Sequence, residues 1–165
     1  MKIIIYISLL MMLITTAFAA DREQEKNRKL VRHYAEVMKV DADFCDAIAR
    51  IESSYKTKAF NNPKKPLNKE TWISRGVMQL TFDTGQKFNK KIREKTDLFH
   101  AEKNIVAGIR FIKYLFNKYP EASPEEIAQI YNLGETKYLQ GMRNQSYENK
   151  FKYVYYDLKN QYAFN

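Results

Sequence analysis

Glu52 is the residue of this chain whose position most needs a chemical explanation. In residues 43–56, DFCDAIARIESSYK, a spacing of about 100° per residue places Phe44, Ile48 and Ile51 on one helical face, and Glu52 falls on the same arc. A carboxylate is costly to bury and usually points to solvent. Either the helix ends near Ile51 and Glu52 turns outward, or Glu52 is a general acid whose pKa is raised by apolar neighbours. Cleavage of a glycosidic bond needs such an acid.

Two further segments carry neutral polar side chains that suit a sugar ligand. In residues 74–81, SRGVMQLT, the amide of Gln79 lies among apolar residues and follows Gly76, where backbone can approach a ligand closely. In IYNLG, Tyr131 and Asn132 precede a glycine turn. Amides and phenols can bind hydroxyl and N-acetyl groups without adding charge. Each segment alone is a weak indication, because a glutamine is commonly hydrogen-bonded within its own protein.

Other catalytic and metal-binding patterns do not occur in the sequence. His33 and His100 are far apart and have no paired ligands, so we expect no metal site and no cofactor. There is no glycine-rich phosphate loop and no serine in a nucleophile elbow. Cys45 is the only cysteine and lies at the border of the apolar helical face, so we expect a buried structural thiol.

The first residues have the features of an export signal. MKIIIYISLLMMLITTAFAA contains one basic residue, an apolar run over residues 3–14, and an A-x-A cleavage pattern that ends at Ala19. We therefore expect residues 1–19 to be a signal peptide and residues 20–165 to form one exported, periplasmic domain with no stable membrane span. The alternative is an uncleaved anchor helix, for which the apolar run is short.

Export changes the meaning of the chain's basic charge. Among 165 residues, 28 are Lys or Arg and 19 are Asp or Glu, and removal of Lys2 with the signal lowers the net charge from +9 to +8. A basic exported protein suits an anionic extracytoplasmic polymer or a membrane surface. Nucleic acid matches the charge equally well, but the compartment argues against it.

Helical periodicity predicts an all-α, or nearly all-α, single domain. No alternating run is long enough for a strand, and no internal repeat occurs. Residues 57–74, TKAFNNPKKPLNKETWIS, have no period and indicate a long loop, which we expect to border the binding cleft. Apolar residues at helical spacing predict one helix through Leu30, Tyr34, Val37 and Met38, a short one through Phe88 and Ile92, and a longer one through Ile105, Ile109, Ile112 and Phe116. Asp41 or Asp43 is expected to cap the helix that carries Glu52. A further helix should start at the capping box of Ser123 and Glu126 and end at Gly134, and the last should span the tyrosine-rich residues 147–160.

The order of these segments resembles the catalytic domain of the soluble lytic transglycosylase family, which is related to goose-type lysozyme. Five segments match family motifs in the right order: E-S-S-Y at 52–55 for E-S-x-[FW], G-V-M-Q-L at 76–80 for G-L-M-Q-[IL], N-I-V-A-G-I-R-F-I-K-Y-L at 104–115 for N-I-x-x-G-x-x-Y-L, I-Y-N-L-G at 130–134 for A-Y-N-A-G, and Y-V at 153–154 for a terminal Tyr-Val pair. The likeness covers residues 30–157 and implies a lysozyme-like fold with a cleft.

The resemblance implies a reaction in which Glu52 is the only catalytic carboxylate. Glu52 would protonate the glycosidic oxygen while the substrate's N-acetyl group stabilises the cationic centre, and would then take the proton of the muramic acid C6 hydroxyl. The product would be a 1,6-anhydro sugar formed without water. The substrate-binding residues implied by the same resemblance are Met78 and Gln79 in the sugar sites, Tyr131 and Asn132 beside the saccharide, Tyr153 against Glu52, and Ser53, which supports the local turn more than the chemistry.

Some positions depart from the family pattern, and two other functions stay open. The 27 positions from Glu52 to Gln79 exceed the expected spacing, and Asn61 stands where a serine is frequent. One alternative is a goose-type lysozyme-like hydrolase, for which Asp83 or Asp97 would have to activate water. The other is a non-catalytic, peptidoglycan-binding subunit of an envelope machine. Small exported members of this family often accompany secretion systems, pili or conjugation apparatus, so such partners are expected beside the glycan strands of peptidoglycan.

Overall fold

Helices make up the fold of the computed structural model, which describes residues 2–61 and 73–163 and, within them, the side chains of residues 20–61 and 73–161. This described part contains seven α-helices, one 3-10 helix and no strand, which confirms the all-α prediction. The elements are α1 (Lys2–Val37), α2 (Ala42–Ser53), α3 (Phe82–Phe88), the 3-10 helix η2 (Lys95–Phe99), α4 (Ala101–Lys118), α5 (Pro124–Leu133), α6 (Glu135–Leu139) and α7 (Gln145–Ala163).

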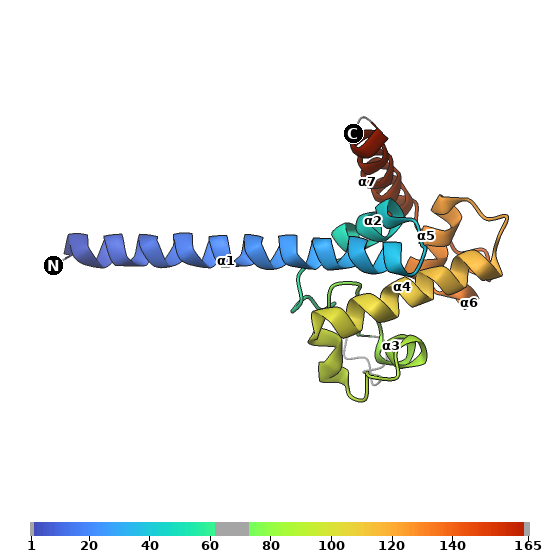
Figure 1. The fold of residues 1–165 in the computed structure, drawn as a ribbon, viewed down its shortest axis with the longest axis horizontal. Coiled ribbons are helices and arrows are strands. Elements are labelled where there is room, and N and C mark those ends of the chain that lie inside the picture. The colour runs from blue at the N-terminus through green and yellow to red at the C-terminus, as the bar shows by residue number, and fades with distance from the viewer. Residues whose placement is uncertain (1, 62–72, 164–165) are drawn as a thin grey trace.

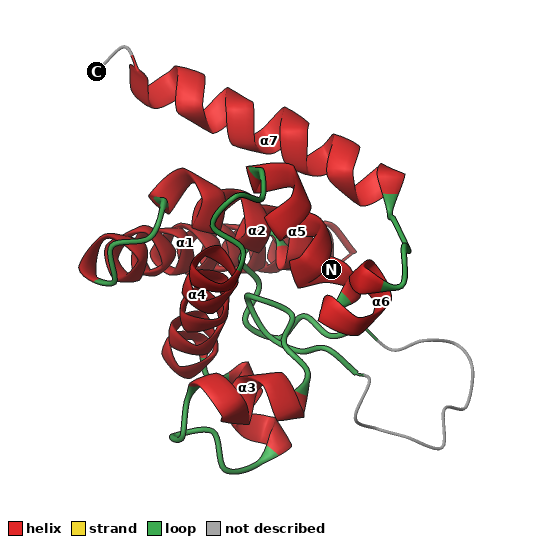
Figure 2. Cartoon of the chain, turned by 90° about the vertical axis from the view of Figure 1, so that its right-hand side faces the viewer, coloured by secondary structure: helices red, strands yellow, loops and turns green. Residues whose placement is uncertain are grey.

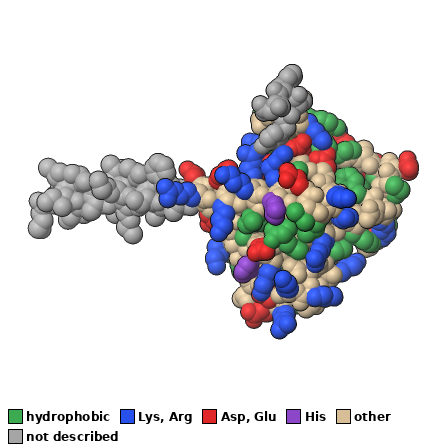
Figure 3. Space-filling model, in the orientation of Figure 1, with side chains coloured by type: hydrophobic (Ala, Val, Ile, Leu, Met, Phe, Trp, Pro, Cys, Tyr) green, Lys and Arg blue, Asp and Glu red, His purple; other side chains and the backbone are tan. Residues whose placement is uncertain are grey.

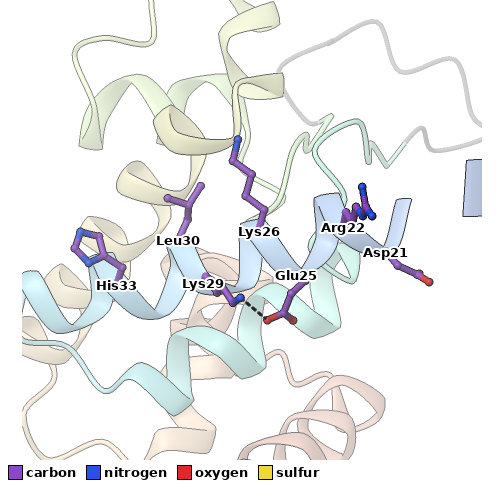
Figure 4. Close-up of a pocket in the computed structure, with 7 residues that line it drawn as sticks. All are labelled: Asp21, Arg22, Glu25, Lys26, Lys29, Leu30 and His33. Atoms are coloured by element: carbon purple, nitrogen blue, oxygen red, sulfur yellow. Dashed lines mark ion pairs between the residues drawn. The ribbon is translucent and has the colours of Figure 1, made fainter. Parts of the chain in front are cut away.

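α1 is one continuous helix that reaches from the apolar N-terminal residues of the sequence into the globular part. Figure 1 shows it projecting away from the other helices, which meet only its last section. Its outer side carries both signs of charge, including the ion pair of Lys29 with Glu25 (Figure 4).

Lys and Arg side chains are spread over the visible face of the globular part rather than gathered at one point (Figure 3). Among the described residues, no helix is long and apolar enough to cross a membrane.

The inner part of α1 packs on α2 around a buried carboxylate. Asp46 is fully buried, and its Oδ2 accepts hydrogen bonds from Arg28 Nε at 3.1 Å and Arg32 Nη1 at 3.2 Å. The Tyr55 hydroxyl donates to Oδ1 of the same carboxylate at 2.5 Å. Asn27 Nδ2 donates to the Tyr55 carbonyl at 2.8 Å. These bonds fix the turn that follows α2 against α1.

The ends of α2 decide where Glu52 points. Asp41 caps the helix by accepting hydrogen bonds from two backbone N–H groups of the first turn, so the first of the two candidate aspartates is the cap. The helix closes at Ser54, whose φ of 50° lies in the left-handed region that terminates many helices. Glu52 therefore belongs to the last helical turn, and the alternative in which the helix stops near Ile51 is wrong.

α7 closes the core by lying across α2 and α5 (Figure 2). The ring of Phe44 on α2 contacts Phe116 of α4, and Phe151 and Tyr155 of α7, with centroid distances of 4.9, 5.0 and 6.0 Å. Buried aromatic contacts of this kind contribute both apolar area and edge-to-face attraction. The helix that carries Glu52 is thus held from one side by α1 and from the other by α7.

The predicted start and stop of α5 are confirmed. Ser123 Oγ accepts from the backbone of Glu126, and the Glu126 carboxylate accepts from the backbone of Ser123, which completes the capping box. The helix ends at Gly134, whose φ of 81° suits a residue without Cβ. This stop places Tyr131 and Asn132 in the last turn of the helix.

The short helix predicted from Phe88 and Ile92 has different bounds. α3 begins at Phe82 and ends at Phe88, while Ile92 is buried in the turn that follows. Asn89 accounts for the break, because its Oδ1 accepts from the Lys91 backbone N–H at 3.1 Å and turns the chain. The apolar spacing of Phe88 and Ile92 therefore reflects burial of two separate elements, and not one helical face.

Candidate active site

A cleft of about 640 Å³ opens where the ends of several helices meet. The last turns of α2 and α5, the first turn of α3, and α6 all contribute to its walls. Its lining combines acids with neutral polar and aromatic groups. These include the carboxylates Glu52, Asp83 and Glu135, the amides Asn61, Gln79 and Asn132, and the rings of Phe111 and Tyr131.

Glu52 is the partly buried carboxyl group of this cleft. Tyr147 donates its hydroxyl to Glu52 Oε1 at 2.7 Å, and the side chain of Asn132 also hydrogen bonds to the carboxyl group. Loss of hydration raises the pKa of Glu52 to about 7, although the two hydrogen bonds oppose the rise by favouring the ionised form. A carboxyl group with this pKa is about half protonated at pH 7 and can donate its proton to a leaving oxygen.

Tyr131 and Asn132 lie beside Glu52, as the sequence predicted, but they are held differently. The Tyr131 hydroxyl donates to the Met78 carbonyl at 2.7 Å, and its ring packs at a tilt of 31° against the Phe111 ring, with the centroids 5.2 Å apart. Tyr131 is buried, so it forms part of the wall of the cleft. Asn132 is exposed to the cleft and keeps one amide hydrogen available for a ligand after its bond to Glu52.

Gln79 lines the cleft, but most of its amide is already bonded to the protein. Its Nε2 donates to the carbonyls of Ala59 at 3.0 Å and Gly76 at 2.9 Å, while Oε1 accepts from Ser74 Oγ at 3.0 Å. Both amide hydrogens are therefore used, and only one lone pair of Oε1 is left for a ligand. Its backbone has a φ of 45°, which is uncommon for a residue with Cβ. Gln79 thus joins the two flanks of the long loop at the edge of the cleft.

Met78 and Gly76 lie in the core, so the Met78 side chain, which was expected in a sugar site, is not exposed to the cleft. Met78 is fully buried, with its backbone N–H bonded to Asn104 Oδ1 at 2.7 Å. Its side chain lies so close to Gly108 that an added Cβ there would come within 2.7 Å. A Cβ at Gly76 would come within 2.2 Å of the Leu98 carbonyl oxygen, so the close approach at this glycine is made by the protein's own backbone.

Ser53 and Cys45 have structural surroundings. Ser53 Oγ donates to the Val77 carbonyl at 2.7 Å, which ties the end of α2 to the segment that carries Gln79, in line with the supporting role expected for it. Cys45 is fully buried, and this burial raises the pKa of its thiol. A thiol without access to solvent does not serve as a nucleophile.

The tyrosine that holds Glu52 is Tyr147, and not Tyr153. Tyr153 is 76 % exposed, and it lies six residues further along α7, on a different side of the helix. Helical spacing could have identified the right residue, because the buried positions Tyr147, Phe151, Tyr155 and Leu158 recur every three or four residues. The Tyr-Val pair drew attention to Tyr153 on resemblance alone.

The two aspartates considered as activators of water lie in different places. Asp83, in the first turn of α3, is exposed and lines the cleft. Asp97 lies in η2, where bonds from Lys103 and from two backbone N–H groups lower its pKa to about 2. Glu135 is a cleft carboxylate that the sequence did not single out. Its Oε1 accepts from Lys118 Nζ at 2.6 Å, and this ion pair lowers its pKa.

The two flanks of the long loop lie at the cleft. Asn61 and Ser74 both line the cleft, and the Asn61 backbone N–H donates to the Ser74 carbonyl at 3.0 Å. The expected border between loop and cleft is therefore present at these flanks, whereas residues 62–72 lie outside the described part of the chain. Asn61, which stands where a serine was expected, is one of the amides that face the ligand space.

His33 and His100 are exposed, and within residues 2–61 and 73–163 no group of three or more His, Cys, Asp or Glu could hold a metal ion.

No curated protein matches the sequence. A family model described as "Transglycosylase SLT domain" matches residues 29–154, which span every element from the end of α1 to the middle of α7. The chain therefore belongs to the family of SLT-domain transglycosylases, whose activity is directed at peptidoglycan.

Proposed function

We propose that this protein is a lytic transglycosylase that cleaves the β-1,4 bond between N-acetylmuramic acid and N-acetylglucosamine and leaves a 1,6-anhydro-muramic end. The observation that carries the proposal is the Glu52 carboxyl group, whose pKa is raised to about 7 at the wall of a cleft in a peptidoglycan-directed family. Its bonded neighbours among the described residues are the neutral groups of Tyr147 and Asn132. A carboxyl group in such surroundings can act as an acid in one step and as a base in the next.

The reaction needs one carboxyl group because the substrate supplies the other reacting groups. Protonated Glu52 gives its proton to the glycosidic oxygen as the bond from that oxygen to muramic C1 breaks. The carbonyl oxygen of the 2-acetamido group stabilises the positive charge that develops at C1. Ionised Glu52 then removes the proton of the C6 hydroxyl while O6 forms a bond to C1. Glu52 ends the cycle protonated, and no water is consumed.

The cleft residues support these steps through binding and hydrogen bonding. Tyr147 and Asn132 donate to the ionised form of Glu52, which exists between the two proton transfers. Asn132 and Asn61 offer amide groups to sugar hydroxyl or N-acetyl groups. Phe111 and Tyr131 supply an aromatic wall against which the apolar face of a sugar ring can pack.

A hydrolase of the goose-type lysozyme kind is the second candidate, and Asp83 is the observation that favours it. Asp83 lines the same cleft as Glu52 and is exposed, so it could accept a proton from an attacking water. Glu135 is less suited to that task, because its carboxylate is engaged by Lys118. The third candidate is a wall-binding subunit without turnover.

Product analysis separates the three functions. Purified peptidoglycan is digested with the protein, and the released muropeptides are weighed by mass spectrometry. We expect muropeptides that are lighter by one water than the hydrolytic products. We expect the Asp83→Asn variant to release them as fast as the wild-type protein does. Ordinary reducing ends, lost in Asp83→Asn, would assign the hydrolase. Release of nothing, from wall that a control lysozyme digests, would assign the binding subunit.

The cellular role is part of the same proposal. The leader at residues 1–19 and the charge of +8 without it are consistent with export to the periplasm, where peptidoglycan lies. A small enzyme of this kind could open the wall locally for a secretion system, pilus or conjugation apparatus. Fractionation of cells that produce the protein, with sequencing of its N-terminus, tests both export and cleavage after Ala19.

A further inference from the structure

Asn144, the residue immediately before α7, uses both ends of its side chain to join two helices. Its Oδ1 accepts a hydrogen bond from the Tyr147 backbone N–H at 3.1 Å, which is the bond of a helix N-cap. Its Nδ2 donates to Asn132 Oδ1 at 2.9 Å. One side chain thus starts the helix that carries Tyr147 and contacts the amide that bonds to Glu52.

The bond from Asn144 determines which end of the Asn132 amide faces Glu52. Asn144 Nδ2 is a donor only, so it must meet the oxygen of the Asn132 amide. The nitrogen of that amide is then turned to the Glu52 carboxyl group, to which it donates. The reverse orientation would place an oxygen against the carboxylate and remove a donor from it.

Gln129 fixes Asn144 against α5. It is a buried residue of α5, its Oε1 accepts from the Asn144 backbone N–H at 2.9 Å, and its Nε2 donates to the Asn144 carbonyl at 3.0 Å. The same Nε2 donates to Glu148 Oε2 at 3.1 Å. Because Asn132 lies on the same helix three residues later, the backbone of Asn144 is held at a fixed place relative to the amide that it orients.

We propose that Asn144 is a positioning residue for the proton-transfer chemistry of Glu52, acting through Tyr147 and Asn132. It starts α7 so that the Tyr147 hydroxyl reaches the carboxyl group, and it turns the Asn132 amide so that a second donor faces it. This inference rests on the proposed function of Glu52 as proton donor. It assigns the tuning of Glu52 to a residue outside the cleft lining.

The charges around Glu52 define what a change at Asn144 would do. The hydroxyl groups of Tyr131 on α5 and Tyr147 on α7 interact electrostatically with Glu52. The cleft further contains Asp83 of α3, and Glu135 and Lys137 of α6. Asn144 itself is neutral. An aspartate in its place keeps an acceptor for the cap but presents an anion, and no donor, to Asn132.

The decisive experiment compares the pH profile of wall cleavage for the wild-type protein and Asn144→Asp. The variant loses an amide that favours ionised Glu52, so the high-pH limb is expected to move up by roughly one pH unit. The rate at the optimum is expected to fall about tenfold. The melting temperature is expected to stay near the wild-type value, because aspartate and asparagine cap helices equally well.

Two further variants keep the test independent of charge and of folding. Asn144→Ser retains a cap but carries no amide donor and adds no charge, and its limb is expected to move in the same direction by a smaller amount. Asn149→Asp makes the same chemical change on the exposed side of α7, where the Gln145 side chain can still donate to it, and its profile is expected to match the wild type.

Titration of the Glu52 carboxyl carbon by ¹³C NMR in the free protein gives a readout without activity. An upward shift of the Glu52 pKa in Asn144→Asp, absent in Asn149→Asp, supports the positioning role whatever the reaction product is. A Glu52 titration unchanged in both Asn144 variants overturns it, including when both lose activity, since Asn144 would then be only a helix cap. Failure of the wild-type protein to form anhydro products would overturn the proposed function and leave the NMR result standing.

Discussion

Two carboxyl groups on α2, six residues apart, are surrounded in opposite ways. Asp46 is fully buried and is bonded by two guanidinium groups, Arg28 and Arg32, and by the hydroxyl of Tyr55. Glu52 is only partly buried and faces the cleft, and its hydrogen-bond partners within the described residues are neutral. The same helix therefore carries one carboxylate that is balanced by cations and one that is not.

This difference agrees with a structural role for Asp46 and with the proposed chemical role of Glu52. Removal of a buried carboxylate that is bonded to cations breaks a buried ion pair, which is strongly destabilising. A carboxyl group with neutral donors and poor hydration keeps its proton to higher pH. Burial alone would not have distinguished the two, since the more buried group is the structural one. What differs is the charge of the hydrogen-bond partners, which are cationic at Asp46 and neutral at Glu52.

The strongest test of the contrast is the Glu52→Gln variant. Glutamine keeps the shape and can still accept from Tyr147, but it cannot give or take a proton. We expect the rate of muropeptide release to fall about 10³-fold with unchanged helical circular dichroism. A variant that retains wild-type activity would show that Glu52 is not the acid.

Removal of the structural acid should affect stability instead. Asp46→Asn removes the fully buried negative charge that accepts hydrogen bonds from the half-buried Arg28 and Arg32, while Arg32 keeps its ion pair with Asp43, and we expect the free energy of unfolding to fall by about 3 kcal/mol in urea titrations. The matched control is Asp157→Asn, which breaks an exposed pair with Arg50 at 4.0 Å and should change stability by less than about 1 kcal/mol. Equal effects at the two positions would contradict the distinction.

The raised pKa of Glu52 predicts a dependence of stability on pH. The pKa of Glu52 rises from 4.5 to about 7 on folding, because the folded protein favours the protonated carboxyl group. The stability that this preference adds is fully present below about pH 4.5 and is lost as the pH rises through 7. Relative to Glu52→Gln, the wild-type protein should therefore lose up to about 3 kcal/mol of stability between pH 4.5 and pH 8.5. Urea titrations of both proteins at the two pH values measure this. A constant difference between them would refute the raised pKa.

The smallest expected effect concerns the hydroxyl group that holds Glu52. In Tyr147→Phe the carboxylate loses one donor, and we expect activity to fall about tenfold while the Glu52 pKa rises. Tyr153→Phe alters a side chain that is 76 % exposed and should match the wild type in both respects. The reverse pattern would restore the role that resemblance first gave to Tyr153.

Local chemistry explains what the sequence could predict. The capping box at Ser123 and Glu126, the stop at Gly134 and the cap at Asp41 all depend on neighbouring residues, and each is found where the pattern indicates. The unusual position of Glu52 on an apolar arc was also visible, because helical periodicity holds through the last turn of α2. Patterns of this kind need no knowledge of distant contacts.

Contacts between distant segments explain what the sequence could not predict. The amide of Gln79 hydrogen bonds to Ala59 and Ser74, which lie on opposite flanks of the long loop. No pattern of neighbouring residues predicts these bonds. Met78 is buried because Gly108 of α4 admits it closely, a relation across 30 positions of sequence. Glu135 becomes a cleft residue tied to Lys118 only once α4 and α6 meet.

The bond between Tyr147 and Glu52 spans 95 positions of the sequence, and it has a consequence for the order in which the protein is made. Glu52 is synthesised early, whereas Asn144 and Tyr147 emerge after the residues that line the cleft. A chain interrupted before α7 would carry the acid without the groups that orient it. On the proposed mechanism, Glu52 would therefore gain its hydrogen bond from Tyr147 only once α7 has been made.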